Sequence, residues 1–551
     1  MEKILILDFG SQTTALIGRR IREFGVYTEI IPGDTPLTDS TIEKLENIKG
    51  VILSGSPESV YADGAAVDRR VYDWGLPLLG ICYGLQRMTA DLGGLVEPLP
   101  KREYGGVEVC IENKSLKTKN WEKAERFLNS FNSEVSLTDI INNTLSRPSS
   151  KPCPQTFIAW FSHGDTLTRL APGFRQIGTS ATGFPAVAVH EEKPWFGVQF
   201  HPEVSHCQRG AEILAAFVFG VCNAVRDWTM EHYVEEVRTD LSQRIGANQV
   251  LLLISGGVDS TVAGALLLKT LPAEQVHLMY VDTGLMRKDE TASVKKALER
   301  LGAKQVHIVH AEDEFLAALK GKEDPEIKRK TIGDLFITVQ EREVAKLGLP
   351  DTYFLVQGTL YTDLIESGKG VGKKAHVIKS HHNVSSPLVD SKRKAGRIIE
   401  PLDRLYKDEV RKLGRLLDVD EQVLRRHPFP GPGLAIRILG EVTKEKCGIL
   451  READAVFIEE LKRRGFYDEI WQAFAVLLSV RSVGVAGDSR KYGYVLALRA
   501  ITSSDGMTAD VFPFPSKDLL EISTLITNTT PEIGRVTYDV SSKPPATIEW
   551  E

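Results

Sequence analysis

The sequence lacks the features that mark disulfide-bonded, zinc-binding, membrane-spanning and nucleic-acid-binding proteins. Its six cysteines are scattered without a C-x-x-C pair, which argues against a disulfide framework and a structural zinc site. It has no apolar run near the roughly 18 residues that a membrane span needs, and no basic, apolar and cleavable stretch that would indicate a secretory signal. The formal net charge of −6 gives no reason to expect nucleic acid as a partner. We therefore expect a soluble, cytoplasmic protein.

What is present suits a large globular chain. At 551 residues the chain is too long for one hydrophobic core, so several domains are expected. Residues 1–110 alternate short apolar runs, at 4–7, 50–53 and 78–80, with helical stretches at 13–23 and 84–92. This is the rhythm of a parallel sheet with crossover helices, in which functional residues gather at the carboxyl ends of the strands.

The rhythm breaks and then resumes. Residues 112–156 are rich in Lys, Asn, Ser and Thr, and we interpret them as a polar surface insertion with one short helix at 121–128. A second strand–helix series begins at residue 250 and continues through apolar runs at 276–281, 305–309 and 353–357. The boundaries that follow are 1–225, 226–426 and 427–551, the last one set by the H-P-F-P-G-P-G segment at 427–433.

The last segment, 427–551, is expected to contain both helices and strands. We expect helices at 444–464 and 467–478, and strands at 494–500 and 535–540. The fold class is therefore multidomain α/β, with two parallel-sheet domains followed by a small α+β domain.

A cysteine stands at a sharp turn between the apolar run that ends at residue 79 and the helix that follows. The sequence G-I-C-Y-G at 80–84 places Cys82 at the apex, with glycines that permit a strained backbone. The positive end of the helix favours the thiolate form of the cysteine. A lone buried cysteine is usually only a small apolar side chain. A nucleophile also needs a base and an orienting group, and Q-F-H-P-E at 199–203 offers both in His201 and Glu203, which point to the same side of an extended chain.

This pairing resembles the class I glutamine amidotransferases. The resemblance implies that Cys82, His201 and Glu203 are catalytic and that Gln86 contacts the substrate glutamine. It also implies that the backbone N–H groups of Gly55 and Tyr83 form the oxyanion hole. The chain departs from the family at residue 56, where the usual S-G-G-P turn has serine in place of its second glycine. If that position needs a positive φ, serine strains it.

A second site is expected where the run at 250–254 ends. S-G-G-V-D-S at 255–260, followed by Thr261, places two glycines and several hydroxyls at the start of a helix, which is an arrangement that binds phosphate. Asp259 fits an anion site only if it meets a cation, which suggests Mg²⁺ bridging it to the phosphates. The segment resembles the ATP pyrophosphatase loop of the adenine-nucleotide hydrolase-like fold. By that resemblance the ATP-binding residues are Ser255, Gly256, Gly257, Val258, Asp259, Ser260 and Thr261.

Two further segments bear on phosphate. G-V-G-K-K at 370–374 is not a Walker A loop, because Ser367 stands where glycine is required and Lys374 where Ser or Thr is required. The segment I-K-S-H-H-N-V at 378–384 contributes Lys379, His381 and His382, which suit a lid over pyrophosphate; a solvated basic loop is the alternative.

Taken together, the two sites, the H-P-F-P-G-P-G segment and the tail K-P-P-A-T-I-E-W-E at 543–551 resemble the glutamine-hydrolysing GMP synthetase family over the whole chain except 112–156. The resemblance implies that XMP is adenylated by ATP and that ammonia from glutamine then displaces AMP to give GMP. It further implies a homodimer formed through the C-terminal domain. The XMP contacts that it implies are Arg329, Gln472, Arg535, Lys543, Ile548 and Glu549.

Two alternatives remain open at this point. Another amidating synthetase, such as one that makes NAD or an amidated amino acid, would share the 255–260 loop but not the 543–551 tail. A nucleotide-binding regulator without amidotransferase activity would explain Ser56 as the mark of a lost site. Turnover of XMP tests the first alternative, and glutaminase activity of Cys82→Ala tests the second.

Overall fold

The computed structural model describes residues 1–61, 66–112, 121–133, 135–142, 155–366, 386–486, 489–503 and 508–551. The described chain forms two compact units. Residues 1–233 and helix α12 (Tyr361–Glu366) make up the first, and residues 234–360 and 386–551 make up the second. Each unit has its own sheets and hydrophobic cores. In the described residues, no helix is both long and apolar enough to cross a membrane.

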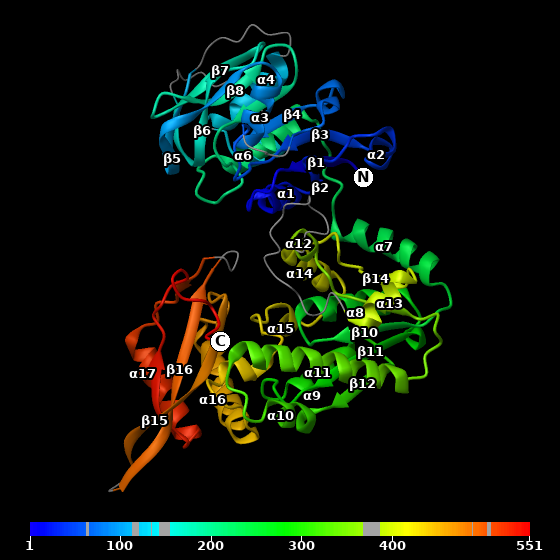
Figure 1. Ribbon diagram of the computed structural model, residues 1–551, viewed down its shortest axis with the longest axis vertical. Helices are drawn as coiled ribbons and strands as arrows, with labels where there is room; N and C mark the ends of the chain where they lie inside the picture. Colours follow the sequence, from blue (N-terminus) through cyan, green and yellow to red (C-terminus); the bar gives the residue numbers. More distant parts are fainter. Residues whose placement is uncertain are drawn as a thin grey trace. The chain divides into compact units, whose positions relative to one another are not determined.

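The first unit is built on a nine-stranded sheet of order β2-β1-β3-β4-β9-β8-β7-β5-β6 (Figure 1). Its strands are β1 (Lys3–Asp8), β2 (Tyr27–Pro32), β3 (Ile48–Leu53), β4 (Leu78–Ile81), β5 (Leu95–Ile111), β6 (Gln155–Arg169), β7 (Phe174–Ser180), β8 (Pro185–His190) and β9 (Trp195–Val198). The first five strands of this order, β2, β1, β3, β4 and β9, pair in parallel, as the sequence predicted. The other four, β8, β7, β5 and β6, extend the sheet with antiparallel pairs.

Both faces of strand β1, in the parallel part of this sheet, are buried. Alternate residues of β1 enter different cores, Ile4 and Ile6 on one side and Leu5 and Leu7 on the other, as period-two side-chain alternation requires. The helices are α1 (Thr14–Glu23), α2 (Asp39–Lys44), α3 (Tyr83–Asp91), α4 (Trp121–Leu128), α5 (Leu137–Ile141) and α6 (Gly210–Ala215), the last continuing into a π-helical stretch, Ala216–Val221.

The interpretation of 112–156 as a surface insertion is wrong for the part that the structure describes. Helix α4 has the predicted bounds, but its Ala124 and Phe127 are buried in the main core of the unit, together with Phe131 and Ile140. The Arg209 guanidinium also donates to backbone carbonyls of this segment. The polar composition of the segment concealed an amphipathic face, because a few apolar residues at helical spacing are sufficient to dock a helix.

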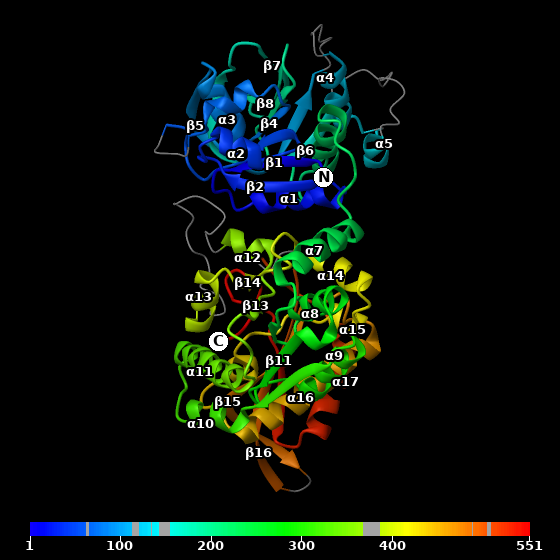
Figure 2. The same ribbon diagram turned by 90° about the vertical axis from the view of Figure 1, so that its right-hand side faces the viewer.

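The second unit contains an all-parallel sheet of order β12-β11-β10-β13-β14. Its strands are β10 (Val250–Ile254), β11 (Val276–Asp282), β12 (Gln305–His310), β13 (Phe354–Val356) and β14 (Ile398–Ile399). In Figure 2 helices α9 and α11 flank strand β11 on opposite sides. The helices of this part are α7 (Met230–Ile245), α8 (Val258–Thr270), α9 (Glu290–Arg300), α10 (Glu312–Leu319), α11 (Pro325–Lys346), α13 (Pro387–Lys394), α14 (Lys407–Leu416) and α15 (Glu421–Leu424).

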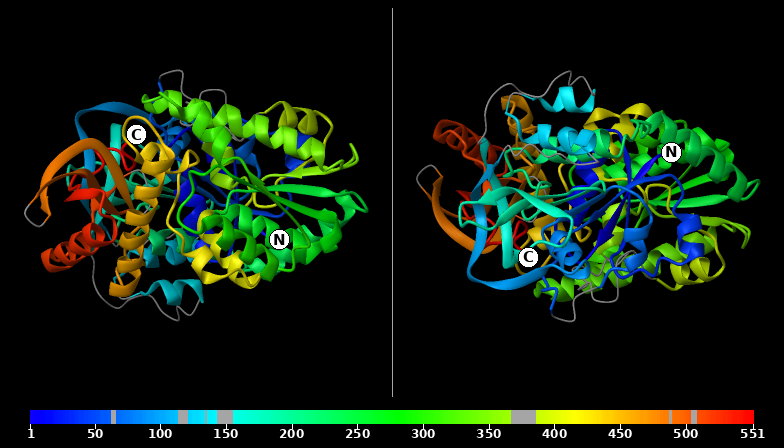
Figure 3. Two further views of the ribbon diagram at one scale, coloured as in Figure 1. Left: turned by 90° about the horizontal axis from the view of Figure 1, so that it is seen from below. Right: turned by 90° about the horizontal axis from the view of Figure 1, so that it is seen from above.

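The C-terminal part adds a four-stranded sheet in which β15 (Gln472–Ala486) and β16 (Ser489–Thr502) form a long curved ribbon (Figure 3). Strands β17 (Asp510–Val511) and β18 (Ile533–Tyr538) pair with β16, and helices α16 (Lys444–Arg464) and α17 (Ser516–Thr529) complete this part. It shares one hydrophobic core with Val281 of β11, Phe315 of α10 and Ile332 of α11. The division into domains at residues 225 and 426 stays a prediction.

One predicted helix is a strand. Residues 467–478 were expected to be helical, yet β15 begins at Gln472. Ala473, Ala475 and Leu477 enter one core while Phe474 and Val476 enter another, so both faces are buried. A stretch that is apolar on both faces shows no alternation in its sequence, and periodicity alone does not distinguish it from a buried helix.

Candidate active sites

The first site is the turn between β4 and α3. Cys82 has φ 50° and ψ −108°, a strained conformation for a residue with a side chain, and its N–H donates to the carbonyl of Val198 at 2.8 Å. The two flanking glycines are needed for close approach and not for their own dihedrals. A Cβ on Gly84 would lie 2.1 Å from the carbonyl oxygen of Leu53, and one on Gly80 would lie 2.6 Å from the backbone nitrogen of Leu85. The predicted elbow is present, with its strain on the cysteine itself.

The imidazole reaches this turn because β9 pairs in parallel with β4, with Val198 beside Ile81. His201 follows β9, and its Nδ1 lies 2.7 Å from Oε1 of Glu203, a wholly buried carboxylate. The two residues lie in a turn and not in an extended strand, so their common direction comes from this hydrogen bond and not from strand alternation. The carboxylate fixes Nδ1 as a donor and leaves Nε2 for chemistry.

The charges around His201 set its protonation. Burial by itself lowers the pKa of the imidazole, but the charges of Glu203 and of the Cys82 sulfur outweigh burial and hold the pKa of His201 well above its ordinary value. The imidazole also interacts directly with the Cys82 side chain. The site therefore favours an imidazolium next to the cysteine, and a positive charge in that position suits a cysteine nucleophile.

The remaining predicted residues of this site surround the sulfur. Gly55 lies against the base, since a Cβ on it would be 3.0 Å from Cε1 of His201. Tyr83 is the first residue of α3, and Gln86 is buried one turn along it with its Nε2 donating to the carbonyl of Asp165 at 2.9 Å. Ser56 does not have a positive φ, so the expected strain at this departure from the family is absent.

One residue near the sulfur was missed. The Nε2 of Gln199 lies 3.9 Å from Sγ of Cys82, and the side chain is buried. Gln199 stands at the start of the Q-F-H-P-E segment, two residues before the predicted base. Its position in that segment was the only sequence signal that pointed to it.

The second site is the loop between β10 and α8. Its hydroxyl groups and glycine backbone are hydrogen-bonded to one another. Oγ of Ser255 lies 3.1 Å from Oγ of Ser260 and accepts a hydrogen bond from the N–H of Gly257 at 3.3 Å. Thr261 donates to the carbonyl of Gly257 at 2.8 Å. Gly256 has φ +77°, a conformation that disfavours other residues. The helix begins at Val258, so its N-terminal N–H groups face the loop, as a phosphate site requires.

Arg426, which the sequence did not point to, braces this loop. Its Nη1 donates to the carbonyl of Gly256 at 2.7 Å and lies 3.1 Å from Oε1 of the buried Glu290. The contact fixes the glycine that has a left-handed conformation. Arg426 comes just before the 427–433 segment, too far along the chain for any local pattern to reveal the contact.

Asp259 lies in the first turn of α8, where both carboxylate oxygens accept hydrogen bonds from Nζ of Lys407. Mg²⁺ typically takes only one or two protein carboxylates and completes its shell with phosphate and water oxygens. A single partly exposed carboxylate beside a phosphate loop fits that requirement. In the residues that the structure describes, no cluster of three or more metal-ligating side chains occurs. Lys379, His381 and His382, the predicted lid residues, lie outside the described residues.

The residues implied to contact XMP are only partly brought together. Gln472 donates to Oε1 of Glu549 at 2.8 Å, and Ile548 packs against the small core of Phe474 and Val476. Arg329 donates to the backbone oxygen of Glu551, also in the tail.

The other two implied residues have contacts of a different kind. Lys543 pairs through its backbone with Ala509. Arg535 is exposed on β18 and has no hydrogen bond or ion pair with the group within the described chain.

Two arginines that hold the tail were missed. Arg437 is fully buried and grips Glu549 with two hydrogen bonds of 3.1 and 2.8 Å. Its guanidinium lies over the rings of Phe429 and Phe474. Arg499, also fully buried, donates to the carbonyls of Ile548, Thr547 and Ser541. Both occur within apolar runs of the sequence. A charged residue in an apolar run was the only sequence signal that pointed to them.

The chain was compared with known protein families, and the matches correspond to its two candidate sites and its C-terminal part. Three family models match the chain: glutamine amidotransferase class-I over residues 5–221, NAD synthase over residues 229–333, and GMP synthase C terminal domain over residues 459–550. The NAD synthase match stops before the C-terminal part, so it indicates the nucleotide-binding fold and does not favour an NAD-forming enzyme.

Relatives named "GMP synthase [glutamine-hydrolyzing]" match along the entire chain. The relative from Caldanaerobacter subterraneus subsp. tengcongensis is 45% identical and the one from Aquifex aeolicus is 46% identical, each match covering 100% of this chain and 99% of the relative. The relative from Brucella suis is 46% identical with the same coverage. The predicted fold class and the predicted resemblance are both confirmed. The chain belongs to the family of glutamine-hydrolysing GMP synthases.

Proposed function

We propose that the chain makes GMP from XMP, hydrolysing glutamine to obtain ammonia and ATP to activate the acceptor. The observation that supports this function is that two candidate sites occur on a chain that its relatives match from end to end. One has a cysteine beside a histidine that is paired with a glutamate, and the other has a glycine- and hydroxyl-rich loop at the carboxyl edge of a parallel sheet.

At the first site, the thiolate of Cys82 attacks the carboxamide carbon of glutamine. The developing oxyanion accepts hydrogen bonds from the N–H groups of Gly55 and Tyr83, and Gln86 contacts the substrate. His201, held by Glu203, passes a proton to the departing ammonia. A water molecule, deprotonated by His201, then cleaves the thioester to glutamate and restores the thiolate beside the imidazolium.

At the second site, the loop at 255–260 holds the phosphates of ATP through its backbone N–H groups and the hydroxyls of Ser255, Ser260 and Thr261. The C2 oxygen of XMP attacks the α-phosphorus and pyrophosphate leaves. Ammonia then adds at C2 and AMP departs, which gives GMP. Lys379, His381 and His382 are proposed to contact pyrophosphate, because cationic and donor side chains suit that product.

Mg²⁺ is the proposed cofactor, with Asp259 as its protein ligand; when bound it neutralises phosphate charge. Lys407 pairs with the same carboxylate, so Asp259 already lies beside one positive charge.

The XMP site is proposed to include Gln472, Ile548, Glu549, Lys543, Arg329 and Arg535. A carboxylate and a backbone group suit the purine edge, and Arg and Lys suit the 5′-phosphate. Arg437 belongs beside Glu549, because it orients that carboxylate and excludes alternative rotamers.

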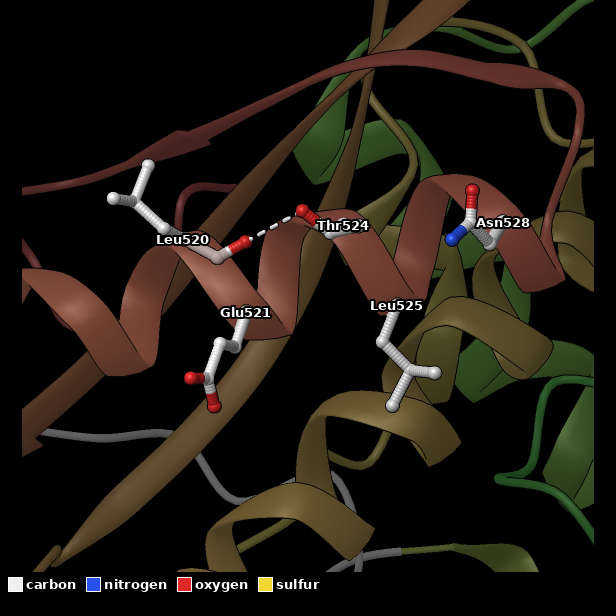
Figure 4. Close-up of a pocket in the computed structure, with 5 residues that line it drawn as sticks. All are labelled: Leu520, Glu521, Thr524, Leu525 and Asn528. Carbon is white, nitrogen blue, oxygen red and sulfur yellow. Dashed lines mark hydrogen bonds between the residues drawn. The ribbon is translucent and has the colours of Figure 1, made fainter.

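A homodimer through the C-terminal part is also proposed. Exposed apolar side chains gather there, among them Val485 with 81% of its surface exposed, and Val480, Val483 and Tyr492 on the same ribbon. Figure 4 shows Leu520 and Leu525 projecting from α17, both exposed. Apolar surface of this kind on a soluble chain indicates an interface, and a second copy is the most common occupant.

Light scattering tests the dimer. We expect the wild type to have twice the chain mass and Val485→Asp with Leu520→Asp to have the mass of one chain. Lys295→Asp, on the exposed face of α9, is a matched charge control and should leave the mass unchanged. A wild type with the mass of one chain would refute the dimer.

Steady-state synthesis with XMP, ATP and either glutamine or ammonia tests the two sites separately. Cys82→Ala should abolish synthesis from glutamine and leave synthesis from ammonia largely intact. Asp259→Asn should abolish both routes, because it acts on the shared adenylation step. Absence of XMP turnover in the wild type would refute the function, and glutamine-driven synthesis by Cys82→Ala would remove Cys82 from the mechanism.

A further inference from the structure

A buried acid and a buried histidine beside the first site have no part in the mechanism above. Glu103 on β5 and His163 on β6 are register partners in antiparallel strands. Glu103 is 4% exposed and His163 is 6% exposed. Charged side chains with so little exposure are rare unless they are paired, and these two face one another.

The contacts of His163 determine where its protons are. Nδ1 lies 2.7 Å from the carbonyl oxygen of Asp165, which can only accept, so Nδ1 carries a proton. Nε2 lies 3.1 Å from Oε2 of Glu103. Both atoms are buried, and neither makes a regular hydrogen bond within the described chain, so their contact is an approach at ion-pair distance. The ring therefore keeps one orientation, with Nδ1 on the carbonyl and Nε2 facing the carboxylate.

The surroundings of Glu103 favour its charged form. Burial raises the pKa of Glu103, but the contacts with His163, Thr182 and Ser180 outweigh burial and lower it. The Ser180 hydroxyl donates to Oε1 at 3.0 Å, and Thr182 donates to the same oxygen. Glu103 is therefore a carboxylate whose Oε1 is held by two hydroxyls and whose Oε2 faces the imidazole of His163.

The same carbonyl connects this pair to the candidate substrate residue. Asp165 O accepts one hydrogen bond from Nδ1 of His163 and another from Nε2 of Gln86, so both of its lone pairs are used. Gln86 lies on α3, one turn beyond Cys82. A contiguous series of contacts thus joins Glu103, His163, the Asp165 carbonyl and the amide of Gln86.

We propose that Glu103 and His163 are positioning residues for glutamine hydrolysis, which fix the Asp165 carbonyl and through it the amide of Gln86. The inference rests on the proposed amidotransferase function of the first site. One N–H of the Gln86 amide is committed to Asp165, so its second N–H and its oxygen are presented in one orientation. A binding group that is oriented beforehand loses less entropy when the substrate arrives, so the role concerns glutamine binding and not the nucleophile.

The test is Glu103→Gln, which keeps the shape of the side chain and removes its charge. We expect the KM for glutamine to rise about tenfold with kcat nearly unchanged, because a charge-assisted hydrogen bond is about twice as strong as a neutral one. Synthesis from ammonia and alkylation of Cys82 by iodoacetamide should keep wild-type rates, since neither needs Gln86. Thr182→Val removes contacts with the other oxygen of Glu103 and with the Ser180 hydroxyl, and it should change the KM by less than about twofold.

The ammonia-driven rate and the alkylation rate show whether Glu103→Gln is folded, so a change in the KM for glutamine alone is not a folding defect. An unchanged KM for glutamine in Glu103→Gln overturns the inference. An equal loss of ammonia-driven synthesis would also overturn it, since that marks a purely structural role. If Cys82→Ala still hydrolyses glutamine, it is the proposed site that fails.

Discussion

Replacing Glu203 by glutamine tests how the first site activates its cysteine. The substitution preserves shape but removes the charge that most strongly raises the pKa of His201. The Glu203 carboxylate is fully buried, and its Oε2 has no hydrogen-bond partner in the described residues. An amide nitrogen placed there would therefore have no acceptor, which adds a second cost.

The magnitude follows from the bond that is weakened. Hydrogen bonds to charged groups contribute about 1.5–3 kcal/mol, so kcat/KM for glutamine should fall about ten- to a hundredfold. The sign of the pH effect is also fixed. The pKa of His201 is raised in the folded chain, so the imidazolium–Glu203 pair stabilises the fold fully below the unfolded imidazole pKa and is lost as pH rises through the folded pKa. In Glu203→Gln the basic limb of glutaminase activity should move to lower pH.

Two assays check this expectation. Glutaminase activity is measured across pH, and alkylation by iodoacetamide reports the thiolate of Cys82 directly, with Cys82→Ala as the blank. Synthesis from ammonia serves as the folding control and should be unaffected. A Glu203→Gln enzyme with the wild-type kcat/KM and the wild-type basic limb would refute the assignment of Glu203 as the group that holds the imidazolium.

Two further substitutions, Gly84→Ala and Arg426→Met, test the backbone geometry of the sites. Gly84→Ala should lower the free energy of unfolding by about 1–3 kcal/mol or more, because its Cβ would lie 2.1 Å from the Leu53 oxygen. The control is Gly448→Ala in α16, which has open space around it and should raise the free energy of unfolding by about 0.4–1 kcal/mol. Equal melting temperatures for the two variants would contradict this. Arg426→Met should raise the KM for ATP about tenfold in both nitrogen routes by freeing the carbonyl of Gly256, with glutaminase activity unchanged as the control.

Local sequence was sufficient to predict the two turns on which both candidate sites are built. The elbow around Cys82 and the loop at 255–260 are each contiguous, and their function depends on a strand–turn–helix geometry that neighbouring residues impose. Helices α4 and α16 were also predicted with their observed bounds, because helical periodicity and capping are local properties. The strand at 472–478 was mistaken for a helix because both of its faces are buried.

Contacts between distant segments could not be predicted. Arg426 at the phosphate loop, Arg437 under Glu549 and Gln199 near the sulfur became recognisable only when the tertiary structure placed them. Their side chains act across gaps in sequence that no repeat or spacing encodes. The same holds for the docking of Phe127, whose segment looked polar throughout.

The sequence by itself determined which chemical groups the protein carries and on which turns they lie, because a strained elbow and a glycine-rich loop are written in consecutive residues. Only the tertiary structure decided how those groups are charged and oriented. The parallel pairing of β4 with β9 brings His201 to Cys82, and burial beside Glu203 raises the pKa of the imidazole. Proximity and dielectric environment arise when distant strands pack together, and for that reason they depend on the fold and not on any motif.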